Sequence, residues 1–175
     1  GNYNYIANHN GFTLADMVSY NRKHNEANGE NNCDGPMENF SWNCGKEGNS
    51  HKEDIVNLRK KQMRNAMALL MFSQGTPCVL AGDEFENTQN GNNNVYCQDN
   101  EIAWLNWSQL KKDSSFFEYV KNIIRIRQTY LHVYFKEMLT GTDKTGCGIP
   151  DMSFHGENAW KIDDDLDSCG LGVYY

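Results

Sequence analysis

The sequence has no long apolar run, no closely spaced cysteine pair and no basic stripe. No stretch approaches the roughly 20 apolar residues that a membrane-spanning helix needs, and no signal peptide opens the chain. The formal net charge is -7, from 16 basic and 23 acidic residues, so little is available to neutralise a row of phosphates. We therefore expect neither a membrane nor a nucleic acid as a partner.

The six cysteines are scattered, and none stands at a spacing that indicates a metal site. Their even number permits disulfides, but a chain of 175 residues can form a core without them. We expect reduced thiols in a cytoplasmic protein. Cys78 lies in an apolar run, which predicts a small buried side chain.

The first part of the chain predicts a strand, a short helix and a long loop. Residues 2–8 alternate in polarity and are typical of a short strand. Thr13 followed by Asp16 is a capping signal for a short helix over residues 14–20. Residues 21–49 are polar and aperiodic, which predicts a long functional or disordered loop.

A second strand and two longer helices are predicted further along. Ser50 and Glu53 form a capping box before a helix that reaches Phe72, and residues 76–81 are typical of a buried strand. Residues 82–107 form a second loop. The expected core face of the first long helix contains Ile55, Leu58, Met63, Ala66, Met67, Leu69, Leu70 and Met71.

The second long helix is predicted to start at a Ser115–Glu118 capping signal, with an apolar face that runs from Phe116 to Leu131. Short β-like pieces follow at residues 134–139, 152–154 and 171–175. The resulting strand–loop–helix order is typical of a parallel sheet with ligands at the carboxyl ends of its strands. Two strands cannot bury themselves, so the chain is expected to be part of something larger.

A series of motifs lies in one order along residues 9–101. They read HNGFTL at 9–14, VSYN at 18–21, KHNEANGEN at 23–31, SWNCG at 41–45, LAGDEF at 80–85, GNNN at 91–94 and YCQDNE at 96–101. Together they resemble the isoamylase and glycogen debranching branch of glycoside hydrolase family 13. The resemblance is nearly continuous from Tyr5 to about Arg127, and weaker through the tail.

The resemblance implies an α/β fold, the C-terminal part of a (β/α)8 barrel followed by the start of a C-terminal β-sandwich. Residues 2–8 would be the seventh strand and residues 76–81 the eighth, with domains at 1–132 and 133–175. The implied chemistry is retaining hydrolysis of α-1,6-glucosidic bonds by two carboxyl groups about 5 Å apart. In the family those groups come from the fourth and fifth strands, which have no counterpart in this sequence.

The family's third catalytic position is a His-Asp pair, which His9 and Asn10 match with one departure. An Asp there stabilises the positive charge of the transition state, whereas Asn10 has no charge. Losing one such electrostatic partner costs about 3–4 kcal/mol, or roughly 100- to 1000-fold in rate. Without the resemblance, the same residues are equally typical of a strand-to-loop turn, because Asn-Gly is a common turn pair.

Other residues matched by the resemblance are candidates for substrate binding. They are Trp42, Asp83, Glu84, Asn93 and Tyr96. The aromatic rings are equally suited to local packing, and the adjacent carboxylates to supporting a loop. The loop asparagines are also suited to Asx turns. The resemblance implies no metal and no organic cofactor.

Three functions remain open at this point. The chain can be an inactive part of a glycogen or starch debranching hydrolase that needs the missing N-terminal barrel portion as a partner. It can instead be a non-catalytic remnant that binds an α-glucan such as glycogen or branched maltodextrin, which Asn10 favours. The third is a structural fragment that self-associates to cover its strand edges and apolar faces.

Overall fold

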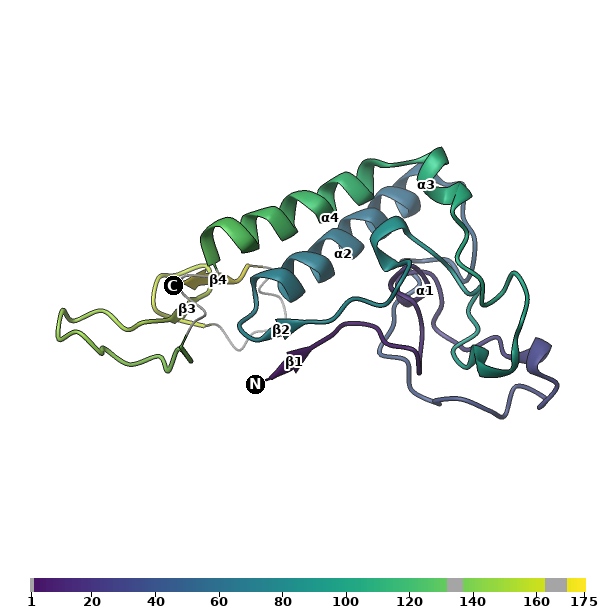
Figure 1. Cartoon of the computed structure of the whole chain (residues 1–175), viewed down its shortest axis with the longest axis horizontal. Helices are drawn as coiled ribbons and strands as arrows, with labels where there is room; N and C mark the ends of the chain where they lie inside the picture. Colours follow the sequence, from purple (N-terminus) through teal and green to yellow (C-terminus); the bar gives the residue numbers. More distant parts are fainter. Residues whose placement is uncertain (1, 132–136, 163–169) are drawn as a thin grey trace. The chain divides into compact units, whose positions relative to one another are not determined.

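The computed structural model describes residues 2–131, 137–162 and 170–175 of the chain. Two compact units are present, Gly1–Arg127 and Gln128–Tyr175, and each has a two-stranded sheet (Figure 1). The first unit contains both predicted long helices and both long loops. It therefore contains the residues at which a site is expected.

The sheet of the first unit joins two strands that are far apart in the sequence. Strand β1 (Tyr3–Asn4) pairs in parallel with β2 (Thr76–Pro77), and helix α2 (Glu53–Phe72) lies between them in the chain. The pair is held by hydrogen bonds such as Thr76 N to Asn2 O, at 2.8 Å. The parallel order was predicted, but the strands are much shorter than residues 2–8 and 76–81. Short parallel pairs are weak without further strands to extend them.

Of the capping hydrogen bonds predicted for the first two helices, one is present and the other is not. Thr13 Oγ1 accepts the backbone N–H of Asp16 and caps α1 (Leu14–Met17), as predicted, although the helix ends before residue 20. Helix α2 begins at Glu53, and its N-cap residue makes no side-chain capping bond. Ser50 Oγ instead accepts the N–H of Lys52, so the predicted capping box is wrong.

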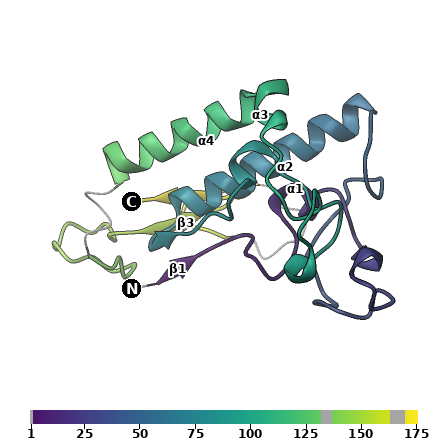
Figure 2. The same ribbon diagram turned by 45° about the vertical axis from the view of Figure 1, so that its right-hand side comes forward.

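The second long helix, α4 (Ser115–Ile126), lies along α2 in both views of the molecule (Figures 1 and 2). A short helix that the pattern did not predict, α3 (Ser108–Lys112), precedes it. Asp113 Oδ1 accepts the N–H of Ser115 at 2.9 Å, which takes the place of the predicted Ser115 cap. After α4 the chain continues into a π-helical turn, η4 (Arg127–Leu131).

The core of the first unit lies between α1, α2 and α4. Its buried residues are Leu14, Met63, Met67, Leu70, Met71, Phe116, Val120 and Ile123. The prediction that the three methionines are core residues is confirmed. The prediction for Leu69 is wrong, because its side chain is 58% exposed while that of Leu70 is 4% exposed. Leu69 therefore lies on the solvent-facing side of α2, about 100° around the helix axis from Leu70.

The second unit has antiparallel strands β3 (Ser153–His155) and β4 (Gly172–Tyr174), close to the predicted pieces at 152–154 and 171–175. The predicted piece at residues 134–139 lies partly outside the described residues. Among those that are described, Cys33, Cys44, Cys78, Cys97 and Cys147 are free thiols.

Cys78 was predicted to be buried and is exposed; it follows β2, a strand of a sheet with two strands among the described residues. Within the described part of the chain, every helix is too short or too polar to traverse a lipid bilayer.

We predict that Leu70→Ala lowers the free energy of unfolding by about 2–5 kcal/mol, because it leaves a cavity in the core. The same change at the exposed Leu69 should cost about 0.5 kcal/mol or less. Urea unfolding followed by circular dichroism measures both. Equal losses at the two positions would contradict this placement of the core face.

Candidate functional site

The chain leaves β1 at residues whose side chains are open to solvent. His9 and Asn10 are both exposed, and the N–H of Asn10 donates to Asn8 Oδ1 at 2.8 Å. The predicted turn is therefore present, and it leaves both side chains available to a ligand. Asn10 also lines a hollow of about 160 Å³ together with Phe12 and with Asn39 and Phe40 of the first loop.

At the end of β2, Asp83 opens the 3-10 helix η2 (Asp83–Phe85) and is only 3% exposed. Its Oδ1 accepts the N–H of Leu14 at 2.9 Å, which ties this strand end to the start of α1. Burial raises the pKa of Asp83 to about 7; the bond from Leu14 opposes this rise, and the charges of Glu84 and Asp16 add to it.

Glu84 Oε2 accepts the N–H of Gly82 at 2.9 Å, so this carboxylate stabilises the backbone where the second loop begins. Asp83 and Glu84 were predicted as substrate-binding residues, with loop support as the alternative. Their hydrogen bonds favour loop support, because each uses a carboxylate oxygen to hold backbone in place.

Asp16 extends the same support from α1 to the second loop. Its carboxylate accepts the hydroxyl of Thr88 and the N–H of Gln89, the latter at 2.8 Å. Burial raises the pKa of Asp16, while these hydrogen bonds oppose the rise. Asp16 and Asp83 therefore both join α1 to the second loop, Asp83 from the loop side and Asp16 from the helix side.

Buried asparagines clamp the two long loops directly to each other. Asn25 Nδ2 donates to Asn93 Oδ1 at 2.8 Å, and the N–H of Asn93 donates back to Asn25 Oδ1 at 3.0 Å. Asn28 and Asn92 exchange amide hydrogen bonds in the same way. These pairs hold residues that are more than 60 positions apart in the sequence.

Asn93 was predicted to bind substrate, and the structure places it among other loop residues that hydrogen-bond its side-chain amide. The residue is fully buried. Its Nδ2 donates to Pro36 O at 2.9 Å and to Asn39 Oδ1 at 2.6 Å, while Oδ1 accepts from Asn25. The amide is thus used entirely within the protein, and Asn93 has a structural role.

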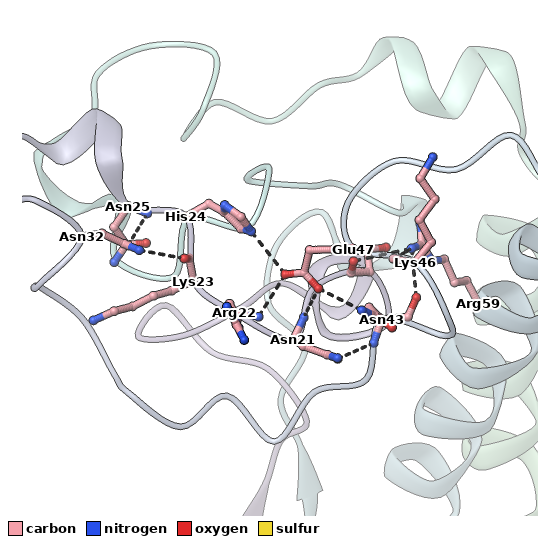
Figure 3. A network of polar contacts seen from close by, with 11 residues as sticks. Asn21, Arg22, Lys23, His24, Asn25, Asn32, Asn43, Lys46, Glu47 and Arg59 are labelled. Atoms are coloured by element: carbon pink, nitrogen blue, oxygen red, sulfur yellow. Dashed lines mark hydrogen bonds and ion pairs between the residues drawn. The ribbon is translucent and has the colours of Figure 1, made fainter.

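Glu47 organises the first loop and was not singled out in the sequence. Its carboxylate accepts the N–H of Asn21 at 2.8 Å, the N–H of Arg22 at 3.0 Å and Asn43 Nδ2 at 3.0 Å (Figure 3). His24 Nε2 lies 3.2 Å from the same carboxylate. Aperiodic loop sequence contains no signal for such a hub, because two of its partners are backbone N–H groups, which almost any residue type supplies.

Arg59 connects this loop to the core helix α2. Its side chain is buried, and Nη2 donates to the carbonyl oxygens of Asn43, at 3.0 Å, and Lys46 (Figure 3). The loop is therefore held at one end by α2 and at the other by the asparagine clamp. These contacts give a loop with little regular secondary structure a defined shape.

The candidate aromatic residues differ in their surroundings. The N–H of Trp42 donates to Met17 O at 2.9 Å, and its side chain is 51% exposed beside a hollow of about 260 Å³. Tyr96 is exposed on the 3-10 helix η3 (Val95–Cys97). The structure thus brings Asn10 and Trp42 to hollows that residues of the first loop help to line, whereas Asp83 and Asn93 are buried.

We predict that Asp83→Asn is more stable relative to wild type at pH 8 than at pH 5. A carboxyl group with a raised pKa stabilises the fold at low pH and loses that contribution as the pH rises through about 7. The amide of the variant still accepts from Leu14 and carries no charge. The relative gain should be on the order of 1–3 kcal/mol in urea unfolding, with Asp54→Asn, at an exposed carboxylate, as the control.

We predict the opposite pH dependence for Glu47. Desolvation raises its pKa, but the hydrogen bonds from Asn21, Asn43, Arg22 and His24 outweigh this and lower it from 4.5 to about 2. Their contribution is complete above pH 4.5 and is lost as the pH falls toward 2.

Thermal unfolding between about pH 5 and pH 3 should show a smaller loss of stability for Glu47→Gln than for wild type, because the variant lacks the titrating group. Glu30→Gln, at an exposed loop carboxylate, is the control and should follow wild type. Parallel curves for Glu47→Gln and wild type would contradict the role of Glu47 as a hub.

Comparison with known proteins gives relatives that match almost three quarters of the chain. No family model matches the chain. A glycogen operon protein GlgX homolog from Mycobacterium bovis is 53% identical over 127 residues, which cover 73% of this chain and 18% of that protein. Isoamylase 1, chloroplastic, from Arabidopsis thaliana is 48% identical over 125 residues, covering 71% of this chain and 16% of the relative.

The fold is similar to that of a solved pullulanase. The crystal structure of pullulanase from Paenibacillus barengoltzii in complex with maltohexaose and alpha-cyclodextrin matches with a TM-score of 0.50 and 24% identity. The match covers 72% of this chain and 15% of that one. The described elements therefore form part of an α/β amylase-type fold.

The chain spans less than a fifth of the length of these relatives. Identity near one half, over almost three quarters of the chain, confirms the resemblance carried by the sequence motifs. The chain therefore belongs to the isoamylase and glycogen debranching enzyme branch of glycoside hydrolase family 13.

Proposed function

We propose that this chain forms the glucan-binding side of a debranching glycoside hydrolase, and that it does not hydrolyse α-1,6-glucosidic bonds by itself. The observation that carries the proposal is the 53% identity to a GlgX homolog over 127 residues of a chain in which Asn10 and Trp42 are exposed. Those two side chains lie at hollows on the first loop, where a sugar chain can reach them.

In this proposal β1 with α2, and β2 with α4, are the seventh and eighth strand–helix units of a (β/α)8 barrel. The parallel pairing of β1 and β2 across α2 supports it. Barrel enzymes place their sites on the loops that follow the strands, and here the exposed candidates Asn10 and Trp42 follow β1 and Tyr96 follows β2. Residues 1–132 then belong to the barrel and residues 133–175 begin a β-sandwich.

The proposed ligand is an α-glucan such as glycogen or branched maltodextrin. Amides can donate to and accept from hydroxyl groups, and aromatic rings can cover the apolar faces of glucose. Exposed Asn10 and Trp42 supply one group of each kind. The similar pullulanase was crystallised with maltohexaose, which supports this class of ligand.

The proposed lack of activity rests on two buried carboxylates, Asp16 and Asp83, which hydrogen-bond groups within the protein. Retaining hydrolysis needs two carboxyl groups about 5 Å apart on either side of the bond. Asp16 and Asp83 are buried and hold backbone groups in place, while Asn10 has no charge with which to stabilise a transition state. We infer that the nucleophile and the general acid come from a partner, the N-terminal barrel portion, and that the protein acts in the cytoplasm.

A second candidate function, a non-catalytic glucan-binding remnant, is favoured by Asn10 alone. Mixing the chain with a separately expressed N-terminal barrel portion distinguishes the two. Restored release of reducing ends by Asn10→Asp, and much less by wild type, supports a debranching enzyme with one defect. Binding without hydrolysis in both mixtures supports the remnant. Light scattering of the purified chain tests the third candidate, self-association.

We predict that the purified chain binds maltohexaose in isothermal titration calorimetry and releases no reducing ends from glycogen or pullulan. Trp42→Ala should weaken binding about tenfold, equivalent to about 1.4 kcal/mol, because a stacking surface is removed. Trp104→Ala, at an exposed indole that bonds Asp99, is the matched control and should leave binding unchanged. Reducing ends released by the chain alone would contradict the proposed lack of activity.

A further inference from the structure

The first loop displays apolar side chains between the asparagine clamp and Trp42. Phe40 is 88% exposed and Met37 is 80% exposed. Large apolar side chains at such exposure contribute little to a core, so packing within the unit does not explain the ring of Phe40. Two residues further on, the N–H of Trp42 donates to the carbonyl oxygen of Met17, which joins this part of the loop to α1.

The backbone of Phe40 lies in the left-handed region, with φ of 49°. That conformation is unfavourable for a bulky residue and easily adopted by glycine. A phenylalanine therefore occupies this position against the local backbone preference, while its ring is in solvent. Neither the backbone nor the core of the unit requires an aromatic side chain at this position.

Phe40 is a shared boundary of two hollows. The hollow of about 160 Å³ is lined by amides, those of Asn8, Asn10 and Asn39, beside Phe40. The hollow of about 260 Å³ is lined by Trp42 and Gln62 beside Phe40. Ile6 and Met17 also line both, so the two hollows are adjacent and Phe40 lies between them.

The lining of these hollows is uncharged. Amides, a hydroxyl, aromatic rings and aliphatic side chains line them, and no acidic or basic residue does so. Such a lining suits a neutral ligand that has hydroxyl groups on its rim and C–H groups on its faces. It offers no cation to an anionic ligand and no carboxylate to a basic one. A pyranose ring has these properties, and two linked rings would occupy two adjacent hollows.

We propose that Phe40 is a further glucan-binding residue, whose ring lies between two consecutive glucose units. One unit occupies the hollow at Asn10 and the next occupies the hollow at Trp42. This inference rests on the proposed function, because it takes the ligand to be an α-glucan. It adds the position at which the chain of glucose units passes from the amide-lined hollow to the aromatic one.

The test compares Phe40→Gly, Phe40→Ala and Phe40→Tyr in maltohexaose titrations and in thermal unfolding. Phe40→Gly should raise the Tm, because glycine adopts the backbone conformation more readily, and should weaken binding at least about tenfold. Phe40→Ala should weaken binding to the same extent. Phe40→Tyr keeps the ring and should bind within about twofold of wild type. Met37→Ala, at an exposed apolar side chain that lines neither hollow, is the matched control.

The outcomes separate this inference from the proposed function. If wild type binds maltohexaose and Trp42→Ala weakens binding while Phe40→Ala does not, only the role of Phe40 is overturned. If Phe40→Gly lowers the Tm and leaves affinity unchanged, the ring has a structural role instead. If wild type does not bind maltohexaose, both the inference and the proposed glucan binding are overturned.

Discussion

The reciprocal amide hydrogen bonds between Asn25 and Asn93 are the contact on which the shape of the site depends. A buried polar group that lacks a partner is costly, so loops without helix or strand must find partners for their amides elsewhere. Here the amides of each long loop form hydrogen bonds with groups of the other loop. The second pair, Asn28 and Asn92, repeats the arrangement and fixes the register between the loops.

This clamp separates the asparagines into two groups with different roles. Those at the centre of the first unit are buried and fully used, as Asn93 is. Those after β1, such as Asn10, are exposed and can still pair with hydroxyl groups. The abundance of asparagine in this sequence therefore reflects both a scaffold and a polar surface. A residue type alone does not say to which group a position belongs.

The acidic residues of the first unit are used in a similar way. Asp83 and Asp16 hold backbone and hydroxyl groups around α1, and Glu47 collects backbone N–H groups in the first loop. Their pKa values move in opposite directions because burial dominates for the two aspartates, whereas hydrogen bonds dominate for Glu47. The carboxylates thus stabilise the loops that display the uncharged, aromatic surface proposed to bind glucan.

The sequence by itself determined the family, through ordered motifs, and both long helices with their methionine core, because helical periodicity is a local property. It did not determine the length of β1 and β2, which depends on how many strands lie beside them. Helical periodicity predicted Leu69 as a core residue, and the resemblance predicted Asn93 as a substrate-binding residue. Only the tertiary structure decided these positions, because burial and hydrogen-bond partners depend on segments that are distant in the chain.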